Sequence, residues 1–326
     1  MLIGRNCMRY KNITDIKLPV SRMVFGTATP AMMSGEPVFE LLDTAFAAGI
    51  NTFDSARIYG EAEKILGEWM IARGNREQIV LMTKGAHPLP DSTEVRVTPE
   101  VIYKDVKESL KMLQTDFIDV YMLHRDNPKK PVGPLVEVLN DLHEAGKIGV
   151  FGGSNWTVNR LEMANEYAYA HDLMGFSVSS PAYSLAEQIE DPWGGGCISI
   201  SGEKQKKDRM WYREEGIEVF AYAALAHGFL SGKFLAERGK DAGKYLDKYA
   251  ILGYCSPQNL ECLKRAEKIA ALKSATVPQV ALAWLLNQPL APMVLFSAST
   301  PERIQENVRA VDIELTQEDI QYLKEG

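Results

Sequence analysis

Short apolar runs alternate with longer amphipathic runs along most of the chain. The apolar runs predict eight strands, and the amphipathic runs predict helices, several of which end at a glycine. We expect the strands at residues 21–26, 51–54, 79–84, 117–124, 148–154, 175–180, 218–223 and 291–297. We expect helices at 36–48, 61–73, 98–113, 132–145, 157–171, 256–272 and 278–288. A last helix begins at Thr300-Pro301-Glu302, which repeats the Thr-Pro-Glu helix start at 98–100.

This alternation indicates a parallel sheet. The strands are apolar without clean alternation, as is typical of strands covered on both faces. Eight successive strand–helix units predict a closed (β/α)8 barrel of the TIM type. An open doubly wound sheet is the structural alternative, and it usually opens with a G-x-G-x-x-G turn after its first strand. Here the first strand ends in Gly26-Thr27-Ala28-Thr29, which lacks that pattern and favours the barrel.

Four segments lie outside the eight units. Residues 7–19 alternate in polarity and turn at Thr14-Asp15, which predicts a β-hairpin that closes the bottom of the barrel. Three long loops, at 85–98, 184–206 and 226–255, follow strands, so we expect them on the face where barrel enzymes carry their active sites. Each loop could instead be surface decoration. Because no linker interrupts the pattern, we expect residues 1–326 to form one domain.

Composition excludes several classes of protein. With 46% hydrophobic and 24% charged residues, the chain is a typical globular protein. Its net charge of -7 disfavours a nucleic-acid partner, so we read the basic run 204–209 as a solvated loop. No apolar run reaches the roughly 20 residues that span a bilayer, and the N-terminus lacks a signal peptide, so we expect a cytoplasmic protein without a membrane partner. Neither a disulfide framework nor a metal site is expected from four scattered cysteines, Cys7, Cys197, Cys255 and Cys262. The oligomeric state stays open.

Reactive side chains follow the ends of successive predicted strands. Asp54, Lys84 and His124 end the second, third and fourth strands, and Tyr59 follows Asp54 in the next loop. Each alone has an ordinary structural reading, but in a barrel all four converge on one pocket. An ammonium group lowers the pKa of a neighbouring phenol, an aspartate keeps that ammonium charged, and a neutral histidine adds a hydrogen bond to a carbonyl oxygen. The four residues, called the tetrad below, therefore indicate protonation of a carbonyl oxygen.

From about residue 20 to residue 320, the chain resembles the aldo-keto reductase superfamily. The matching stretches are FDSARIYG, LMTKG, DVYMLHRD, FGGSNW, VFAYAALAHGFLSGK and RIQEN. The resemblance implies an NAD(P)H-dependent barrel enzyme that reduces an aldehyde or ketone, with Tyr59 as proton donor. It implies that Lys84 and Asp54 tune the pKa of Tyr59 and that His124 orients the carbonyl. The stretch SSPAYSLAEQ resembles bacterial members related to aminocyclitol-antibiotic reductases, which points to a sugar-like or cyclitol-like substrate.

The resemblance also implies the cofactor site. Ser154 and Asn155 match residues that bind the nicotinamide carboxamide, and Tyr222 matches the ring that stacks under the nicotinamide. Arg303 matches a ligand of the 2′-phosphate, so NADPH is expected with NADH possible, unless Arg303 only pairs with Glu302 or Glu306. The predicted cofactor residues are Gly26, Thr27, Ser154, Asn155, Ser180, Tyr222, Leu225, Gly228, Ser231, Ser297, Ser299, Arg303, Glu306 and Asn307. Ser180, Ser297 and Ala223-Ala224 depart from the usual family residues. Candidates for the substrate pocket are Arg57, His87, Trp156 and Trp193.

Two other functions remain open at this point. A Schiff-base lyase would use Lys84 as a neutral nucleophile, whereas Asp54 is expected to keep it charged. A non-catalytic nicotinamide-nucleotide-binding sensor subunit would use the same pocket without turnover, and the intact tetrad argues against it.

Overall fold

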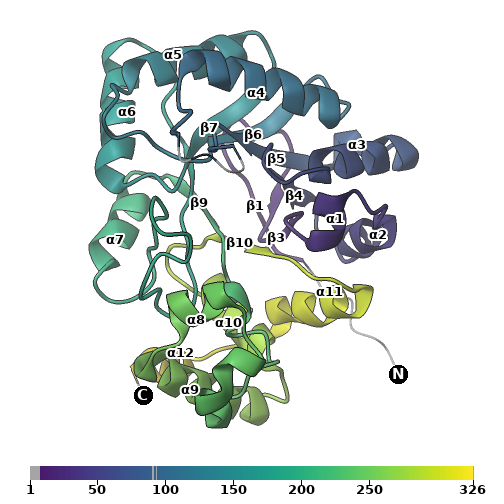
Figure 1. The fold of residues 1–326 in the computed structure, drawn as a ribbon, viewed down its shortest axis with the longest axis vertical. Helices are drawn as coiled ribbons and strands as arrows, with labels where there is room; N and C mark the ends of the chain where they lie inside the picture. Colours follow the sequence, from purple (N-terminus) through teal and green to yellow (C-terminus); the bar gives the residue numbers. More distant parts are fainter. Residues whose placement is uncertain (1–7, 90–91, 93, 326) are drawn as a thin grey trace.

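Eight parallel strands close into a barrel (Figure 1). The structure is a computed structural model that describes residues 8–89, 92 and 94–325. Around the barrel the strand order is β10-β3-β4-β5-β6-β7-β8-β9. The strands are β3 Met23–Gly26, β4 Thr52–Asp54, β5 Val80–Gly85, β6 Ile118–Leu123, β7 Ile148–Ser154, β8 Val178–Ser180, β9 Glu218–Ala221 and β10 Met293–Phe296. The predicted (β/α)8 barrel is confirmed, and the open sheet is excluded.

The barrel closes because β10 pairs with both the first and the last of the other strands. Val294 of β10 is in register with Met23 of β3, and Met293 is in register with Phe220 of β9. Nearly every strand residue is buried, because one set of side chains fills the barrel and the alternate set packs against the helices. This two-sided burial explains why the strands showed no clean alternation.

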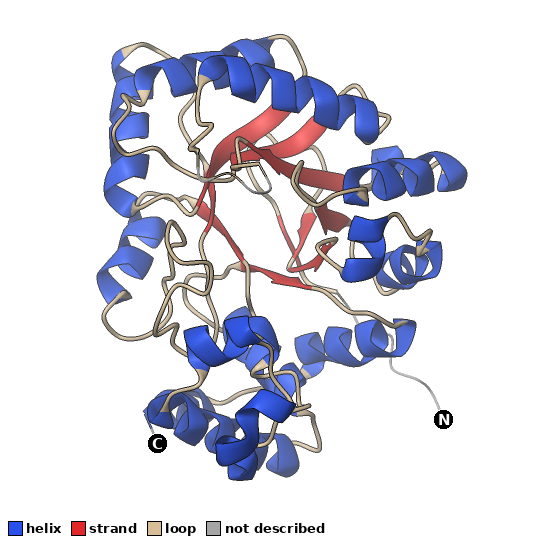
Figure 2. Cartoon of the chain, viewed as in Figure 1, coloured by secondary structure: helices blue, strands red, loops and turns tan. Residues whose placement is uncertain are grey.

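Helices surround the strands on the outside of the barrel (Figure 2). They include α2 Phe39–Ala47, α3 Ala62–Arg73, α4 Pro99–Met112, α5 Gly133–Glu144, α6 Val158–Ala170, α7 Lys206–Glu214, α9 Pro257–Leu272, α10 Val277–Leu286 and α11 Pro301–Val308. The two Thr-Pro-Glu starts are confirmed, since the hydroxyls of Thr98 and Thr300 each accept a backbone N–H from the first turn. Within the described residues, no single helix is long and apolar enough to span a membrane. In the described part of the chain, only α9 and α10 taken together, across a 97° bend, have the length and composition of a membrane span.

The N-terminal hairpin differs from its predicted limits. β1 Tyr10–Lys11 pairs antiparallel with β2 Val20–Ser21, so the hairpin extends to residue 21, and residue 7 lies outside the described residues. The turn falls at Thr14-Asp15 as expected. Ile13 packs with the interior side chains at the start of the barrel strands, so the hairpin closes the barrel bottom as predicted.

Several short elements were not predicted. They are α1 Pro30–Ser34, α8 Lys248–Tyr254 and α12 Gln317–Glu325, with the 3-10 helices η1 Arg76–Gln78, η2 Ala226–Gly228, η3 Ala236–Lys244 and η4 Arg309–Asp312. A helix of two turns shows too few apolar positions to reveal its period. The basic run 204–209 also differs from its prediction, because it enters the first turn of α7 rather than forming a loop. There Arg209 donates hydrogen bonds to the carbonyls of Ile200 and Gly202.

Candidate active site

The tetrad is built on three adjacent strands. Asp54 ends β4, Lys84 lies near the end of β5, and His124 directly follows β6. The Lys84 ammonium donates hydrogen bonds to the Asp54 carboxylate and, over 3.0 Å, to the carbonyl of Ser55. Both ionic side chains are almost completely buried. The neighbouring parallel strands thus hold a buried ion pair at the carboxyl end of the barrel.

Tyr59 reaches the same place from the loop after β4. The Lys84 ammonium lies 5.6 Å from the centre of the Tyr59 ring. The His124 ring lies edge-on, at 5.7 Å between ring centres. Gly60 follows with a φ of +55°, and a Cβ there would lie 2.3 Å from the carbonyl oxygen of Met33. The sharp turn that aims Tyr59 into the site therefore requires glycine. All four predicted catalytic side chains come together.

Burial keeps the phenol of Tyr59 protonated and the imidazole of His124 neutral. Burial raises the pKa of Tyr59, and the opposing effect of Lys84 does not overcome it. The expected lowering of this pKa toward neutrality is therefore not found. Burial alone would lower the pKa of Lys84, but Asp54 and Tyr59 raise it above its usual value. Burial, reinforced by Lys84, holds the pKa of His124 well below its usual range, as the predicted neutral role requires.

A second histidine extends the site. The ring of His87 lies 4.7 Å from that of His124, between ring centres. His87 Nδ1 lies 2.7 Å from the carbonyl oxygen of Pro88, so this nitrogen carries the proton in the neutral ring. Burial lowers the pKa of His87. Within the described residues, Nδ1 of His124 has no hydrogen-bond partner. His87 thus lies beside the tetrad, where a substrate residue was predicted.

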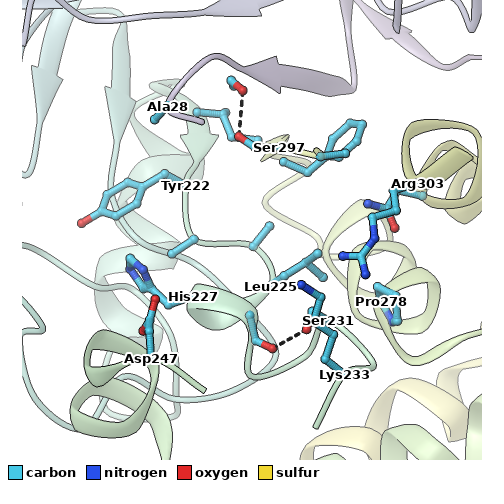
Figure 3. A pocket seen from close by; sticks show the side chains of 18 of the residues that line it. Ala28, Tyr222, Leu225, His227, Ser231, Lys233, Asp247, Pro278, Ser297 and Arg303 are labelled. Carbon is cyan, nitrogen blue, oxygen red and sulfur yellow. Dashed lines mark hydrogen bonds between the residues drawn. The ribbon is translucent and has the colours of Figure 1, made fainter. Parts of the chain in front are cut away.

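A cavity of about 660 Å³ begins at the tetrad and extends toward the start of α11 (Figure 3). This volume is typical of a small-molecule site. Asp54 and Tyr59 line one end. Nine of the predicted cofactor residues line the cavity: Gly26, Tyr222, Leu225, Gly228, Ser231, Ser297, Arg303, Glu306 and Asn307. In Figure 3, Tyr222 and His227 lie on one side, and Arg303 and Lys233 lie on the other.

The remaining predicted cofactor residues do not line this cavity. The hydroxyls of Thr27, Ser154 and Ser180 are buried, and they donate hydrogen bonds to Ser55 Oγ and to the carbonyls of Ser180 and Phe220, respectively. Ser299 is exposed but lies outside the lining. Strand position alone did not reveal that these hydroxyls turn toward neighbouring strands.

Asn155 holds Tyr222 instead of lining the cavity. Its Oδ1 accepts a 2.7 Å hydrogen bond from the Tyr222 hydroxyl and one of 3.1 Å from the backbone N–H of Ile198. Its Nδ2 donates to Ser154 Oγ at 3.2 Å. The backbone of Asn155 has a left-handed φ of 62°. Its side-chain amide lies between Tyr222, which follows β9, and the insertion after β8. Asn155 thereby fixes the position of the Tyr222 ring in the cavity wall.

Two cations without carboxylate partners lie at the far end. Arg303 is on the first turn of α11, and Lys233 follows Ser231 in the loop after η2. In the described part of the chain, neither forms an ion pair, so the alternative pairing of Arg303 with Glu302 or Glu306 is not found. Sequence reasoning missed Lys233, although it ends the matched stretch VFAYAALAHGFLSGK. Its position two residues after Ser231 was the available signal.

The other substrate candidates divide. Trp193, from the insertion 184–206, lines the cavity and contacts His227 with 4.6 Å between ring centres. Arg57 turns away and pairs with Glu108 at 3.0 Å. Trp156 is fully buried, and its indole N–H donates to the carbonyl of Arg125, so it is a core residue and not a pocket residue. Among the described residues, no group of three or more His, Cys, Asp or Glu is placed to hold a metal ion.

Comparison with known proteins agrees with this arrangement. Residues 22–326 match the family described as the aldo/keto reductase family. The chain is 30% identical to aldo-keto reductase str7 of Strobilurus tenacellus, over 88% of this chain and 80% of that protein. It is 28% identical to aldo-keto reductase YhdN of Bacillus subtilis (strain 168), over 91% and 87%. It is also 27% identical to a probable voltage-gated potassium channel subunit beta of Arabidopsis thaliana, over 94% and 92%. The chain therefore belongs to the aldo/keto reductase family of oxidoreductases.

Proposed function

We propose that this protein reduces an aldehyde or ketone to an alcohol, with NADPH preferred and NADH as the weaker cofactor. The observation that carries the proposal is one continuous cavity. Asp54 and the protonated phenol of Tyr59 line one end, with the Lys84 ammonium paired to Asp54 and the neutral ring of His124 beside Tyr59. At the other end lie two cations that no carboxylate of the described chain neutralises. A sugar-like or cyclitol-like carbonyl is the substrate class we favour.

The lining fits a nicotinamide dinucleotide. Arg303 and Lys233, with the N-terminus of α11 beside them, are suited to phosphate groups. Tyr222 offers its ring as a platform near the tetrad, and Asn155 fixes that ring. Ser154 and Asn155 would then influence the nicotinamide indirectly, by fixing the Tyr222 ring, unless their side chains turn toward the cavity when the cofactor binds. The bound cofactor would supply the hydride.

The tetrad would supply the proton. Tyr59 donates its hydroxyl proton to the carbonyl oxygen, while His124 orients that oxygen as a neutral hydrogen-bond partner. The phenolate that forms is stabilised by the adjacent ammonium of Lys84, which Asp54 keeps charged and in place. The raised pKa of Tyr59 in the free protein makes it a donor that holds its proton until the carbonyl is bound.

The structure and the comparisons argue against one of the two alternative functions and lend support to the other. A Schiff-base lyase needs a neutral Lys84, and the raised pKa of Lys84 argues against it. A nucleotide-binding sensor subunit gains support from the similarity to a protein named as a probable channel subunit beta. Such a subunit needs the cofactor cavity but no rapid turnover.

Oxidation of NADPH, followed across aldehydes, keto-sugars and inososes, tests the proposal. We expect turnover that is lost when Tyr59 is replaced by Phe. Tight NADPH binding with no turnover of any carbonyl in the screen would favour the sensor subunit. Trapping of Lys84 by borohydride in the presence of a ketone would favour the lyase.

A further inference from the structure

Arg125 lies between the catalytic histidine and the insertion after β8. It directly follows His124, and its guanidinium donates a 2.9 Å hydrogen bond to the His124 carbonyl. On the other side is Gly196 of the insertion, where an added Cβ would lie 3.8 Å from Arg125 Cδ. The side chain is only partly buried. Arg125 therefore lies beside His124 of the tetrad and next to the insertion, adjacent to the residues that line the cavity but not among them.

The guanidinium of Arg125 carries a positive charge that nothing in the described chain neutralises. Three other arginines are each paired with a carboxylate, Arg57 with Glu108, Arg96 with Asp105 and Arg160 with Asp126. Lys84 is paired with Asp54. Within the described residues, Arg125 has no carboxylate at ion-pair distance, and its guanidinium donates to a neutral carbonyl.

The Asp191 carboxylate of the facing insertion is already engaged. Asp191 accepts a 2.9 Å hydrogen bond from the backbone N–H of Trp193 and a 2.8 Å bond from that of Cys197. These bonds hold the loop that carries Trp193 to the cavity. Asp191 therefore shapes the insertion and leaves the guanidinium available to a ligand.

The charge of Arg125 reaches the reacting groups. Burial dominates the pKa values of both Tyr59 and His124, and the charge of Arg125 also acts to lower each of them. It acts in the same direction on the pKa of Cys197, which burial raises to about 11, so that this thiol stays neutral. His87 and His124 are also neutral at neutral pH, because burial lowers the pKa of each. The His124 side of the tetrad therefore carries the positive charge of Arg125, which no carboxylate of the described chain neutralises.

We propose that Arg125 binds a carboxylate on the substrate, so that the enzyme prefers carbonyl compounds that carry an acid group. This inference rests on the proposed reductase function and adds an acid group to the sugar-like or cyclitol-like carbonyl favoured above. A guanidinium can grip a carboxylate through two parallel hydrogen bonds. A single unpaired cation matches one negative charge, which favours a carboxylate over a doubly charged phosphate. The carbonyl would meet Tyr59 and His124 while the acid group extends toward the insertion.

Two aldehydes of nearly equal shape test this. We would measure kcat/KM for 4-carboxybenzaldehyde and for its methyl ester, methyl 4-formylbenzoate, and take the ratio of acid to ester. The wild-type ratio should exceed one, and Arg125→Gln should lower it about tenfold or more. Arg125→Lys keeps the charge but loses the pair of parallel N–H donors, so its ratio should lie between those of the wild type and Arg125→Gln. Arg57→Gln is the matched control, because that arginine is paired with Glu108, and its ratio should match the wild type.

A binding measurement separates this inference from the reductase function. Calorimetry with the protein saturated with NADP⁺ would compare 4-(hydroxymethyl)benzoate with its methyl ester. The acid should bind more tightly, and Arg125→Gln should remove that advantage. If neither aldehyde turns over but the acid still binds through Arg125, the reductase function fails and the acid site stands. An unchanged acid-to-ester preference in Arg125→Gln, or an equal loss in Arg57→Gln, overturns the acid site.

Discussion

Tyr59 is the residue on which the proposed chemistry depends most directly. Replacing it with Phe removes the proton donor and keeps the ring beside Lys84 and His124. We expect the rate of reduction to fall by about 10² or more, the usual contribution of a general acid. The cofactor should still bind, because the hydroxyl is not part of the far end of the cavity. Steady-state kinetics and cofactor titration check this, and near-normal turnover would remove Tyr59 from its assigned role.

Lys84 should matter through its charge. Lys84→Met leaves Asp54 buried without its cation and removes the ammonium that stabilises the phenolate. We expect most activity to be lost while the protein stays folded, with a reduced stability that urea unfolding will measure. Full activity in a folded Lys84→Met protein would make the lysine structural.

The pH dependence follows from the direction of the pKa shift of Tyr59. The protonated phenol is the active form, so reduction is lost as pH rises through its pKa. Burial raises that pKa from its ordinary value of about 10, so the alkaline limb should lie at or above this pH. No limb from His124 is expected near pH 6.5, because burial lowers its pKa well below that value. A profile of kcat/KM from pH 5 to 11 checks both statements, because kcat/KM reports the groups of the free enzyme. An alkaline limb well below pH 10 would contradict the first statement, and a limb centred near pH 6.5 would contradict the second.

At the scale of the element, the turn after β4 has no room for added volume. Gly60 and Gly74 both have a positive φ, at +55° and +59°. A Cβ at Gly60 would meet the Met33 carbonyl oxygen at 2.3 Å, whereas nothing lies within 4 Å of a Cβ at Gly74. Alanine at either position should cost roughly 1 kcal/mol for the left-handed backbone. Only Gly60→Ala should also displace Tyr59 and lower kcat/KM. Equal activity of the two variants would show that the turn does not position the tyrosine.

The elements also show how much of the fold and of the site could be predicted from the sequence. Strands and helices of the repeat follow from periodicity and from the caps Thr98 and Thr300, since both are local properties. The tetrad was predictable because barrel topology brings strand ends together wherever their side chains point. The orientation of individual side chains was not predictable. For this reason Trp156 and Arg57 were predicted to line the substrate pocket, whereas Trp156 lies in the core and Arg57 pairs with Glu108. Periodicity cannot reveal which way a loop folds back, and so Lys233 was missed.

Cofactor selectivity is a property of the whole molecule, because the cavity joins the loop after β9 to the first turn of α11. A ligand that binds only the folded state stabilises it, by roughly 2.7 kcal/mol at a hundredfold excess over Kd. We expect NADPH to raise the Tm by more than NADH at equal concentration, since Arg303 and Lys233 offer cations to the additional phosphate.

Arg303→Ala should weaken NADPH binding by roughly 1.5–3 kcal/mol, as for a charge-assisted contact, and should change NADH binding little. Thermal shift and dissociation constants for both cofactors measure this directly. Arg309 directly follows α11 and is not among the residues that line this cavity, so Arg309→Ala provides the matched control. Equal losses for the two cofactors in Arg303→Ala would place the 2′-phosphate elsewhere.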